Sequence, residues 1–133
     1  MINEAGELKI VDFGIAAASQ SSDTKLTKTG LLVGTPTYMS PEQVLGKEID
    51  EKTDIYSLGT IMYEMLTGRP PYSGKDSMSI MYQHVQGEAK PPIEKNDKVP
   101  AALSELVMNC MKVKPEERIQ SMTELKTSLE KLK

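Results

Sequence analysis

Specific interactions inside the protein are indicated for three charged side chains, those of Glu42, Arg118 and Asp54. Glu42 falls in the first turn of a predicted helix, and if that turn is buried the carboxylate needs a cationic partner. Arg118 is the best candidate, because a guanidinium can hold a carboxylate with two parallel hydrogen bonds and so lock two distant segments together. Asp54 falls inside the apolar arc of another helix. It is either half solvated near the helix N-terminus, where the helix dipole favours an acid, or buried and bonded to backbone N–H groups of a loop.

Two stretches near the N-terminus are harder to interpret from the residues alone. The Asp-Phe-Gly tripeptide at 12–14 follows a short predicted strand at 8–11, and by itself it indicates only a turn. Residues 16–32 have no periodicity, and six hydroxyl residues lie within 19–29. A solvated surface loop explains this composition. Its length also favours a functional role, because structureless loops above about 12 to 15 residues are uncommon in compact domains.

The element that must position these groups is a helix from Asp50 to Gly68. At about 100° per residue its apolar side chains cover an arc of about 220°, roughly twice what a surface helix needs. The remaining positions form a polar strip, consisting of Thr53, Ser57, Thr60 and Glu64. We therefore expect a central helix with other elements packed on at least two sides.

The other helices are expected to act as scaffold. A helix start is predicted at Ser40-Pro41-Glu42-Gln43, where Ser40 can cap and Gln43 can complete a capping box. Three apolar faces follow the central helix: Met78, Met81, Tyr82 and Val85; Leu103, Leu106, Val107, Cys110 and Met111; and Met122, Leu125, Leu129 and Leu132, behind a capping box from Ser121 to Glu124. Cys110 is expected to be a buried inert thiol and His84 an exposed helix residue.

Composition argues against several classes of function. The 133 residues carry a formal net charge of −3 with acids and bases interspersed, which argues against nucleic acid and anionic membranes as partners. No apolar run approaches the roughly 18 residues of a membrane span, and the first ten residues have no signal-peptide core. A single cysteine cannot form an internal disulfide. We expect one domain, or part of one, in the cytoplasm.

A set of short motifs occurs in a fixed order along the chain. They are Asp12-Phe13-Gly14, Gly34-Thr35, Ser40-Pro41-Glu42, Asp54 to Gly59, Gly68-Arg69-Pro70-Pro71-Tyr72 and Arg118. Together they resemble the C-terminal lobe of a Hanks-type, eukaryotic-like serine/threonine protein kinase of bacterial type, over residues 2–132. The resemblance implies a mainly α, partial protein-kinase-like fold with one or two short N-terminal strands. It divides the chain into a strand with the Asp-Phe-Gly motif (1–14), an activation segment (15–42) and a helical lobe (43–133).

The resemblance also implies roles in nucleotide and substrate binding. Asp12, with Phe13 and Gly14, would bind the Mg²⁺ that bridges the phosphates of ATP. Thr27 and Thr29 would be the phosphorylation sites of the activation segment, favoured over the other hydroxyl residues of that loop.

The remaining roles that the resemblance implies concern the substrate and the scaffold. Thr35 would contact the catalytic aspartate and help to select Ser/Thr substrates. Glu42 and Arg118 would form the structural ion pair of the family, and Asp54 would hold the catalytic loop through its backbone. The resemblance also implies a structural role for Gly59.

Essential parts of a kinase are missing from this sequence. It contains no Gly-rich loop, no strand lysine paired with a helix glutamate and no His-Arg-Asp catalytic loop with its asparagine. We therefore interpret the chain as the C-terminal portion of a kinase that begins just before the Asp-Phe-Gly motif. The full-length parent would transfer phosphate from ATP to protein Ser/Thr, and this chain alone would be inactive, with doubtful binding of ATP and Mg²⁺.

Two alternatives to the kinase interpretation remain. The chain could be a non-catalytic docking module of pseudokinase type that uses its helix at 78–85, or an unrelated helical domain with chance matches. If the kinase interpretation holds, the lobe should expose apolar surface and an undersatisfied carboxylate at Asp54. Its partners would be a protein substrate and either the missing N-lobe and catalytic loop or a second copy.

Overall fold

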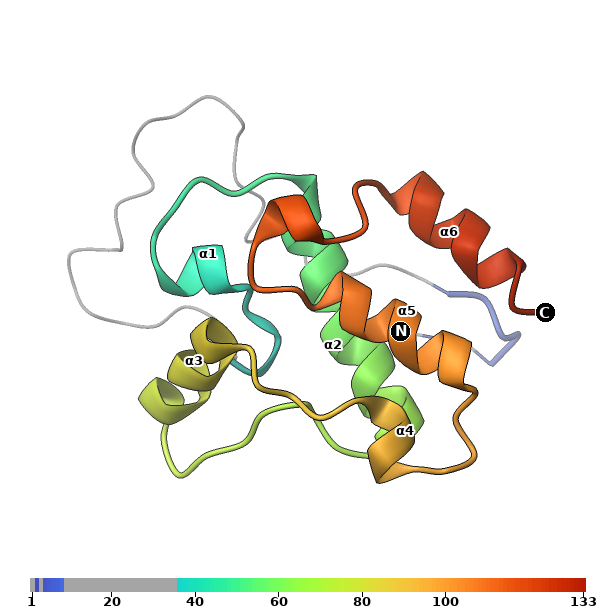
Figure 1. The fold of residues 1–133 in the computed structure, drawn as a ribbon, viewed down its shortest axis with the longest axis horizontal. Coiled ribbons are helices and arrows are strands. Elements are labelled where there is room, and N and C mark those ends of the chain that lie inside the picture. The colour runs from blue at the N-terminus through green and yellow to red at the C-terminus, as the bar shows by residue number, and fades with distance from the viewer. Residues whose placement is uncertain (1, 3, 9–35) are drawn as a thin grey trace.

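The computed structural model describes residues 2, 4–8 and 36–133, and this part of the chain is mainly α-helical, as expected (Figure 1). Its helices are η1 (Pro36–Tyr38, a 3-10 helix), α1 (Pro41–Val44), α2 (Glu51–Thr67), α3 (Ser77–Gln86), α4 (Pro92–Lys95), α5 (Ala101–Cys110), η2 (Pro115–Glu117, also 3-10) and α6 (Met122–Glu130). Of the short strands that were expected near the N-terminus, the described residues show one antiparallel bridge between Ile2 and Leu8.

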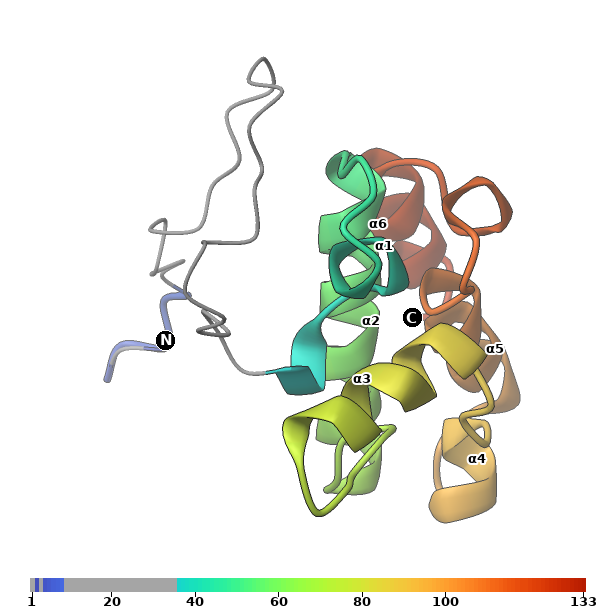
Figure 2. The same cartoon turned by 90° about the vertical axis from the view of Figure 1, so that its left-hand side faces the viewer.

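Helix α2 is the central element of the lobe, as predicted (Figures 1 and 2). It begins after Asp50, whose carboxylate accepts the N–H of Lys52 at 2.8 Å, and it ends at Gly68 in the left-handed conformation. One apolar cluster joins Ile55 to α5 and α6, and a second joins Tyr56 and Tyr63 to the other side of α5 and to Tyr72. The helix is therefore packed on two sides.

The orientation of α2 differs from a simple apolar-inside arrangement. The polar strip faces the protein, because Thr53 and Thr60 are buried. Part of the apolar arc is exposed instead, including Ile61 and Met65, the latter 79% exposed. Asp54 lies on this exposed side, so the solvated one of its two sequence interpretations is correct for this structure. The exposed apolar residues also agree with the expectation that the lobe leaves apolar surface uncovered.

Helix α3 is rotated relative to the face predicted for it. Met78 and Tyr82 were assigned to the buried face, but they are 71% and 65% exposed. Met81 is buried as predicted, and His84 is buried as well. The prediction failed because it scored His84 as a polar surface residue, whereas this side chain finds hydrogen-bond partners inside the protein.

Helix α5 follows its predicted face closely, and α6 follows its predicted face in part. Leu106, Val107 and Cys110 are buried on α5, and Leu125 is buried on α6, while Met122 and Leu132 at the ends of the third face are exposed. Burial raises the pKa of the Cys110 thiol to about 12, which agrees with an inert thiol.

Gly59 marks the closest approach of α2 to α5. A Cβ atom at this position would lie 2.7 Å from Cβ of Cys110 and 3.0 Å from Cγ of Met111. Neither neighbour can withdraw easily, because both side chains are buried in the core. The absence of a side chain at Gly59 therefore lets α5 lie against α2.

We predict that Gly59→Ala lowers the free energy of unfolding by about 1 kcal/mol. Overpacking costs about 1 to 3 kcal/mol, and the higher helix propensity of alanine offsets at most about 1 kcal/mol of that. Urea unfolding followed by circular dichroism measures the change. Met65→Ala on the exposed side of the same helix is the matched control and should stay within about 0.5 kcal/mol. Equal or higher stability of Gly59→Ala would contradict the tight contact.

Candidate functional site

Helix α1 begins with the capping box that the sequence predicts. The Ser40 hydroxyl accepts the N–H of Gln43 at 3.3 Å, and the Gln43 side chain accepts the N–H of Ser40 at 2.9 Å. Pro41 occupies the first helical position, where its missing N–H costs nothing. The cap leaves Glu42 in a buried first turn.

Glu42 and Arg118 form a buried, bidentate ion pair. Nη1 of Arg118 donates to Oε1 of Glu42 and Nη2 donates to Oε2, each at 2.7 Å. The other three N–H groups of Arg118 donate to the carbonyls of Lys112, Lys52 and Val113 at 2.7, 2.9 and 3.0 Å. All five donors of the guanidinium are therefore used. One side chain joins α1, the start of α2 and the segment after α5.

The environment of Glu42 favours its ionised form overall. Burial by itself raises the pKa of this carboxyl, but hydrogen bonds from Arg118 and from the Thr53 hydroxyl, which donates at 2.7 Å, lower it. The net effect is a pKa below the ordinary value. Because both charges are fully paired, the desolvation cost of the buried pair is compensated.

The polar strip of α2 holds the short turn formed by residues 36–39, which we call the docked turn. The Ser57 hydroxyl donates to the carbonyl of Tyr38 at 2.8 Å, and the Tyr38 hydroxyl donates to the carboxylate of Glu64 at 2.7 Å. Figure 1 shows this segment running between α1, α2 and α3. The polar strip is thus a binding surface for the chain itself.

His84 is buried, which corrects the sequence prediction of an exposed residue. Its Nε2 lies 3.1 Å from the carbonyl oxygen of Thr37, which can only accept, so Nε2 carries the proton. Its Nδ1 therefore accepts from the Tyr56 hydroxyl at 2.7 Å. Tyr72 packs edge-on against the ring at 4.8 Å between centroids. Burial lowers the pKa of His84 to about 4, so the ring is neutral at pH 7.

Sequence reasoning missed these contacts of the docked turn. The one available signal was the helical spacing of His84 three residues after Met81, which places both side chains on one face. No local pattern pairs Ser57 or Tyr56 with partners so far away in the sequence.

Comparison with known proteins assigns the family. The protein kinase domain family matches residues 1–129. The chain belongs to the protein kinase family. Over 129 residues it is 39% identical to the serine/threonine-protein kinase PknB of Mycobacterium tuberculosis, covering 97% of this chain and 21% of that protein. Over 136 and 133 residues it is 41% identical to probable serine/threonine-protein kinases of Corynebacterium efficiens and Clostridium acetobutylicum, covering 99% and 100% of this chain. The chain spans about a fifth of the length of these relatives.

Family membership confirms the resemblance to Hanks-type serine/threonine kinases and excludes an unrelated helical domain. Within this kinase lobe the structure brings Glu42 and Arg118 together, packs Gly59 against α5 and exposes Asp54. The other predicted site residues lie outside the described residues: Asp12, Phe13, Gly14, Thr27, Thr29 and Thr35.

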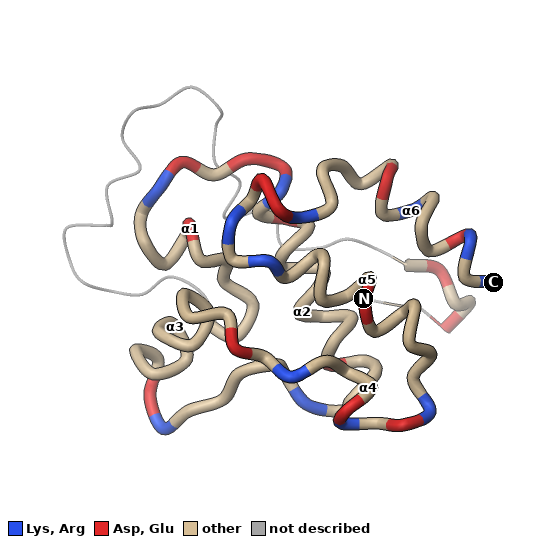
Figure 3. Tube along the Cα trace, in the orientation of Figure 1, with Lys and Arg blue, Asp and Glu red and all other residues tan. Residues whose placement is uncertain are grey.

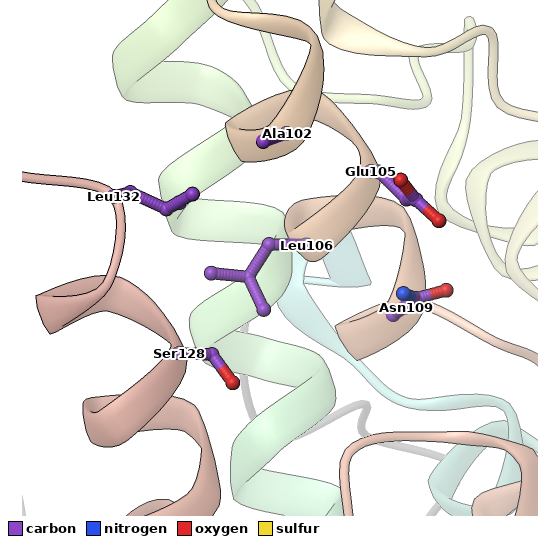
Figure 4. Close-up of a pocket in the computed structure, with 6 residues that line it drawn as sticks. All are labelled: Ala102, Glu105, Leu106, Asn109, Ser128 and Leu132. Carbon is purple, nitrogen blue, oxygen red and sulfur yellow. The ribbon is translucent and has the colours of Figure 1, made fainter.

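A shallow hollow lies between α5 and α6, away from the docked turn (Figure 4). Its volume is about 160 Å³, well below the roughly 300 Å³ of the smallest usual ligand pockets. It is lined by Ala102, Glu105, Leu106, Asn109, Ser128 and Leu132.

The described part of this kinase lobe contains no group of acids, histidines or cysteines that could hold a metal ion. None of its helices has the length and apolar character that a membrane span requires. Figure 3 shows basic and acidic residues mixed along the same part of the chain.

We predict that Arg118→Lys lowers the free energy of unfolding of this kinase lobe by about 3 kcal/mol. A lysine keeps the charge but cannot hold the carboxylate bidentately and reach three carbonyls as well, so buried polar groups lose their partners. Chemical denaturation measures the loss. The control is Lys114→Ala, which breaks the exposed pair with Glu117 and should cost less than about 0.5 kcal/mol. Equal effects of the two substitutions would refute the assigned role of Arg118.

We also predict that the free energy of unfolding decreases as the pH is lowered below 6.5. The pKa of His84 is about 4 in the folded chain against an ordinary 6.5, so the unfolded chain binds the proton first as the pH falls. The contribution of His84 to the free energy of unfolding is therefore complete above pH 6.5 and is lost towards pH 4, by at most roughly 1.4 kcal/mol per pH unit. The lowered pKa of Glu42 continues this loss below its ordinary value of 4.5.

Urea unfolding at a series of pH values measures this dependence, with His84→Gln as the control that removes the titrating ring. The decline between pH 6.5 and 5 should disappear in the variant. A wild-type chain with constant stability over that interval would contradict the buried neutral histidine.

Proposed function

We propose that this chain provides the helical, substrate-presenting lobe of a serine/threonine protein kinase. The observation that carries the proposal is the docked turn, held by the polar strip of α2 next to the Glu42–Arg118 pair. Thr35, which the family resemblance links to substrate selection, immediately precedes this turn in the sequence. A lobe built in this way fits the task of holding a hydroxyl-bearing peptide segment in one place, which phosphoryl transfer needs more than covalent chemistry.

The residue roles implied by the family are part of the same proposal. Asp12, supported by Phe13 and Gly14, would hold the Mg²⁺ that neutralises phosphate charge when ATP is bound. Thr27 and Thr29 would be phosphorylated in an activation segment that spans 15–42. Thr35 would contact the catalytic aspartate and favour Ser/Thr over Tyr substrates.

The exposed side of α2 is the proposed contact for the catalytic loop. Asp54 offers a free carboxylate there for backbone N–H groups, and Ile61 and Met65 offer apolar surface beside it. A His-Arg-Asp loop is absent from the 133 residues, so it must come from other polypeptide sequence. The proposed partners are therefore an N-lobe with this loop and a protein substrate. We propose a cytoplasmic location, which a reduced, buried Cys110 suits.

A second candidate function is a docking module without catalysis. It is favoured by Met78 and Tyr82, which lie one helical turn apart on α3 and are both largely exposed. Such a module would bind partner proteins through α3 whether or not a catalytic loop is supplied.

We predict that the isolated chain does not transfer phosphate from ATP and Mg²⁺ to a generic protein substrate, because one metal ligand without the base and the lysine cannot assemble a transition-state clamp. Adding a separate polypeptide with the N-lobe and catalytic loop of a similar kinase should restore transfer. Incorporation of radiolabelled phosphate measures both reactions. Activity of the chain alone would refute the proposed incompleteness.

The restored reaction also tests the role of Asp54. Asp54→Ala should reduce the rescue by at least about tenfold, since a charge-assisted hydrogen bond to the loop is lost. Glu51→Ala, an exposed acid one turn earlier on the same helix, should leave it unchanged. Binding of the added polypeptide without any transfer, together with partner capture through α3, would favour the docking module.

A further inference from the structure

His84 is the one histidine of the chain, and its burial is not explained by packing alone. An apolar side chain would fill the same space without the cost of burying two ring nitrogens. Both nitrogens are used instead, one on the carbonyl of Thr37 and one on the hydroxyl of Tyr56. The ring therefore joins α3 to the docked turn and to α2.

The hydrogen bond from His84 completes the hold on the docked turn. Two consecutive carbonyls, those of Thr37 and Tyr38, accept from different helices, His84 of α3 and Ser57 of α2. Because the two donors lie on separate rigid elements, the turn cannot rotate about its own axis without breaking one of them. Among the described residues, no other donor reaches the carbonyl of Thr37.

Tyr56 connects this histidine to the buried ion pair. Its hydroxyl donates to Nδ1 of His84, which carries no proton in the tautomer that donates to the turn, and this bond holds the ring in place. The guanidinium of Arg118 lies over the ring of Tyr56, 4.9 Å from its centroid. A continuous set of contacts thus runs from Glu42 through Arg118 and Tyr56 to His84 and the docked turn.

We propose that His84, oriented by Tyr56, is a positioning residue for peptide binding: it fixes the docked turn, which directly follows Thr35 in the sequence. The inference rests on the proposed function. Displacement of the turn is then expected to weaken binding of the peptide and to leave binding of ATP unaffected.

Two substitutions separate positioning from packing. In His84→Gln the amide nitrogen can occupy the place of Nε2 and still donate to the carbonyl of Thr37. In His84→Asn the shorter side chain places its polar atoms near Nδ1 only, so the turn loses its donor. Leu125→Ala, on α6 in the core shared with α2 and α5, is the control for general loss of stability.

The first measurement is amide hydrogen exchange of the 133-residue chain, read at Tyr38 and Met39 and compared with α5. His84→Asn should speed exchange in the docked turn by about tenfold, and His84→Gln by less than about threefold. Leu125→Ala should show no selective effect at the turn. If both His84 variants and Leu125→Ala change exchange only in proportion to their loss of stability, His84 is a packing residue and the proposal is overturned.

The second measurement uses the chain complemented by the N-lobe polypeptide. His84→Asn should raise KM for a peptide substrate by about fivefold and leave KM for ATP unchanged, and His84→Gln should restore the peptide KM. An unchanged peptide KM despite faster exchange would overturn the link to substrate. Absence of transfer by the wild-type complex would refute the proposed function instead. The exchange data would still show whether His84 fixes the docked turn.

Discussion

The lobe depends on the buried ion pair of Glu42 and Arg118. These residues are 76 positions apart, and their two parallel 2.7 Å hydrogen bonds fix the first turn of α1 against the segment that follows α5. Since all five donors of the guanidinium have acceptors, the pair avoids the penalty of an unsatisfied buried charge. Breaking it would release α1 and expose the polar side of α2.

The second organising feature is that different sides of α2 make different contacts. Its two packed sides build the core, and its polar strip holds the docked turn through the Ser57 hydroxyl and the Glu64 carboxylate. Its exposed side carries Asp54, Ile61 and Met65. A helix with three different surfaces explains why its apolar arc is so wide. Buried polar groups at the strip are tolerated because the described side chains of this kind all have hydrogen-bond partners.

Most of the predictions that succeeded were local, and the Glu42–Arg118 pair, 76 positions apart, is the exception. The capping box at Ser40, the helix that ends at Gly68 and the buried thiol of Cys110 follow from a few neighbouring residues or from helical period. The main prediction that failed was the buried face of α3, where His84 was assigned to solvent and Met78 and Tyr82 to the core. A sequence shows that a side chain is polar but not whether a hydrogen-bond partner lies near it in the interior.

The sequence by itself determined the helices, their caps and the family, because ordered motifs and the 3.6-residue period are properties of the chain alone. It also named Arg118 as the partner that Glu42 would need. Only the tertiary structure decided which side of α2 is exposed, that His84 bonds the carbonyl of Thr37, and that α5 lies against Gly59. These facts depend on distances between residues that are remote in sequence, and such distances are fixed by packing of the whole lobe rather than by any local pattern.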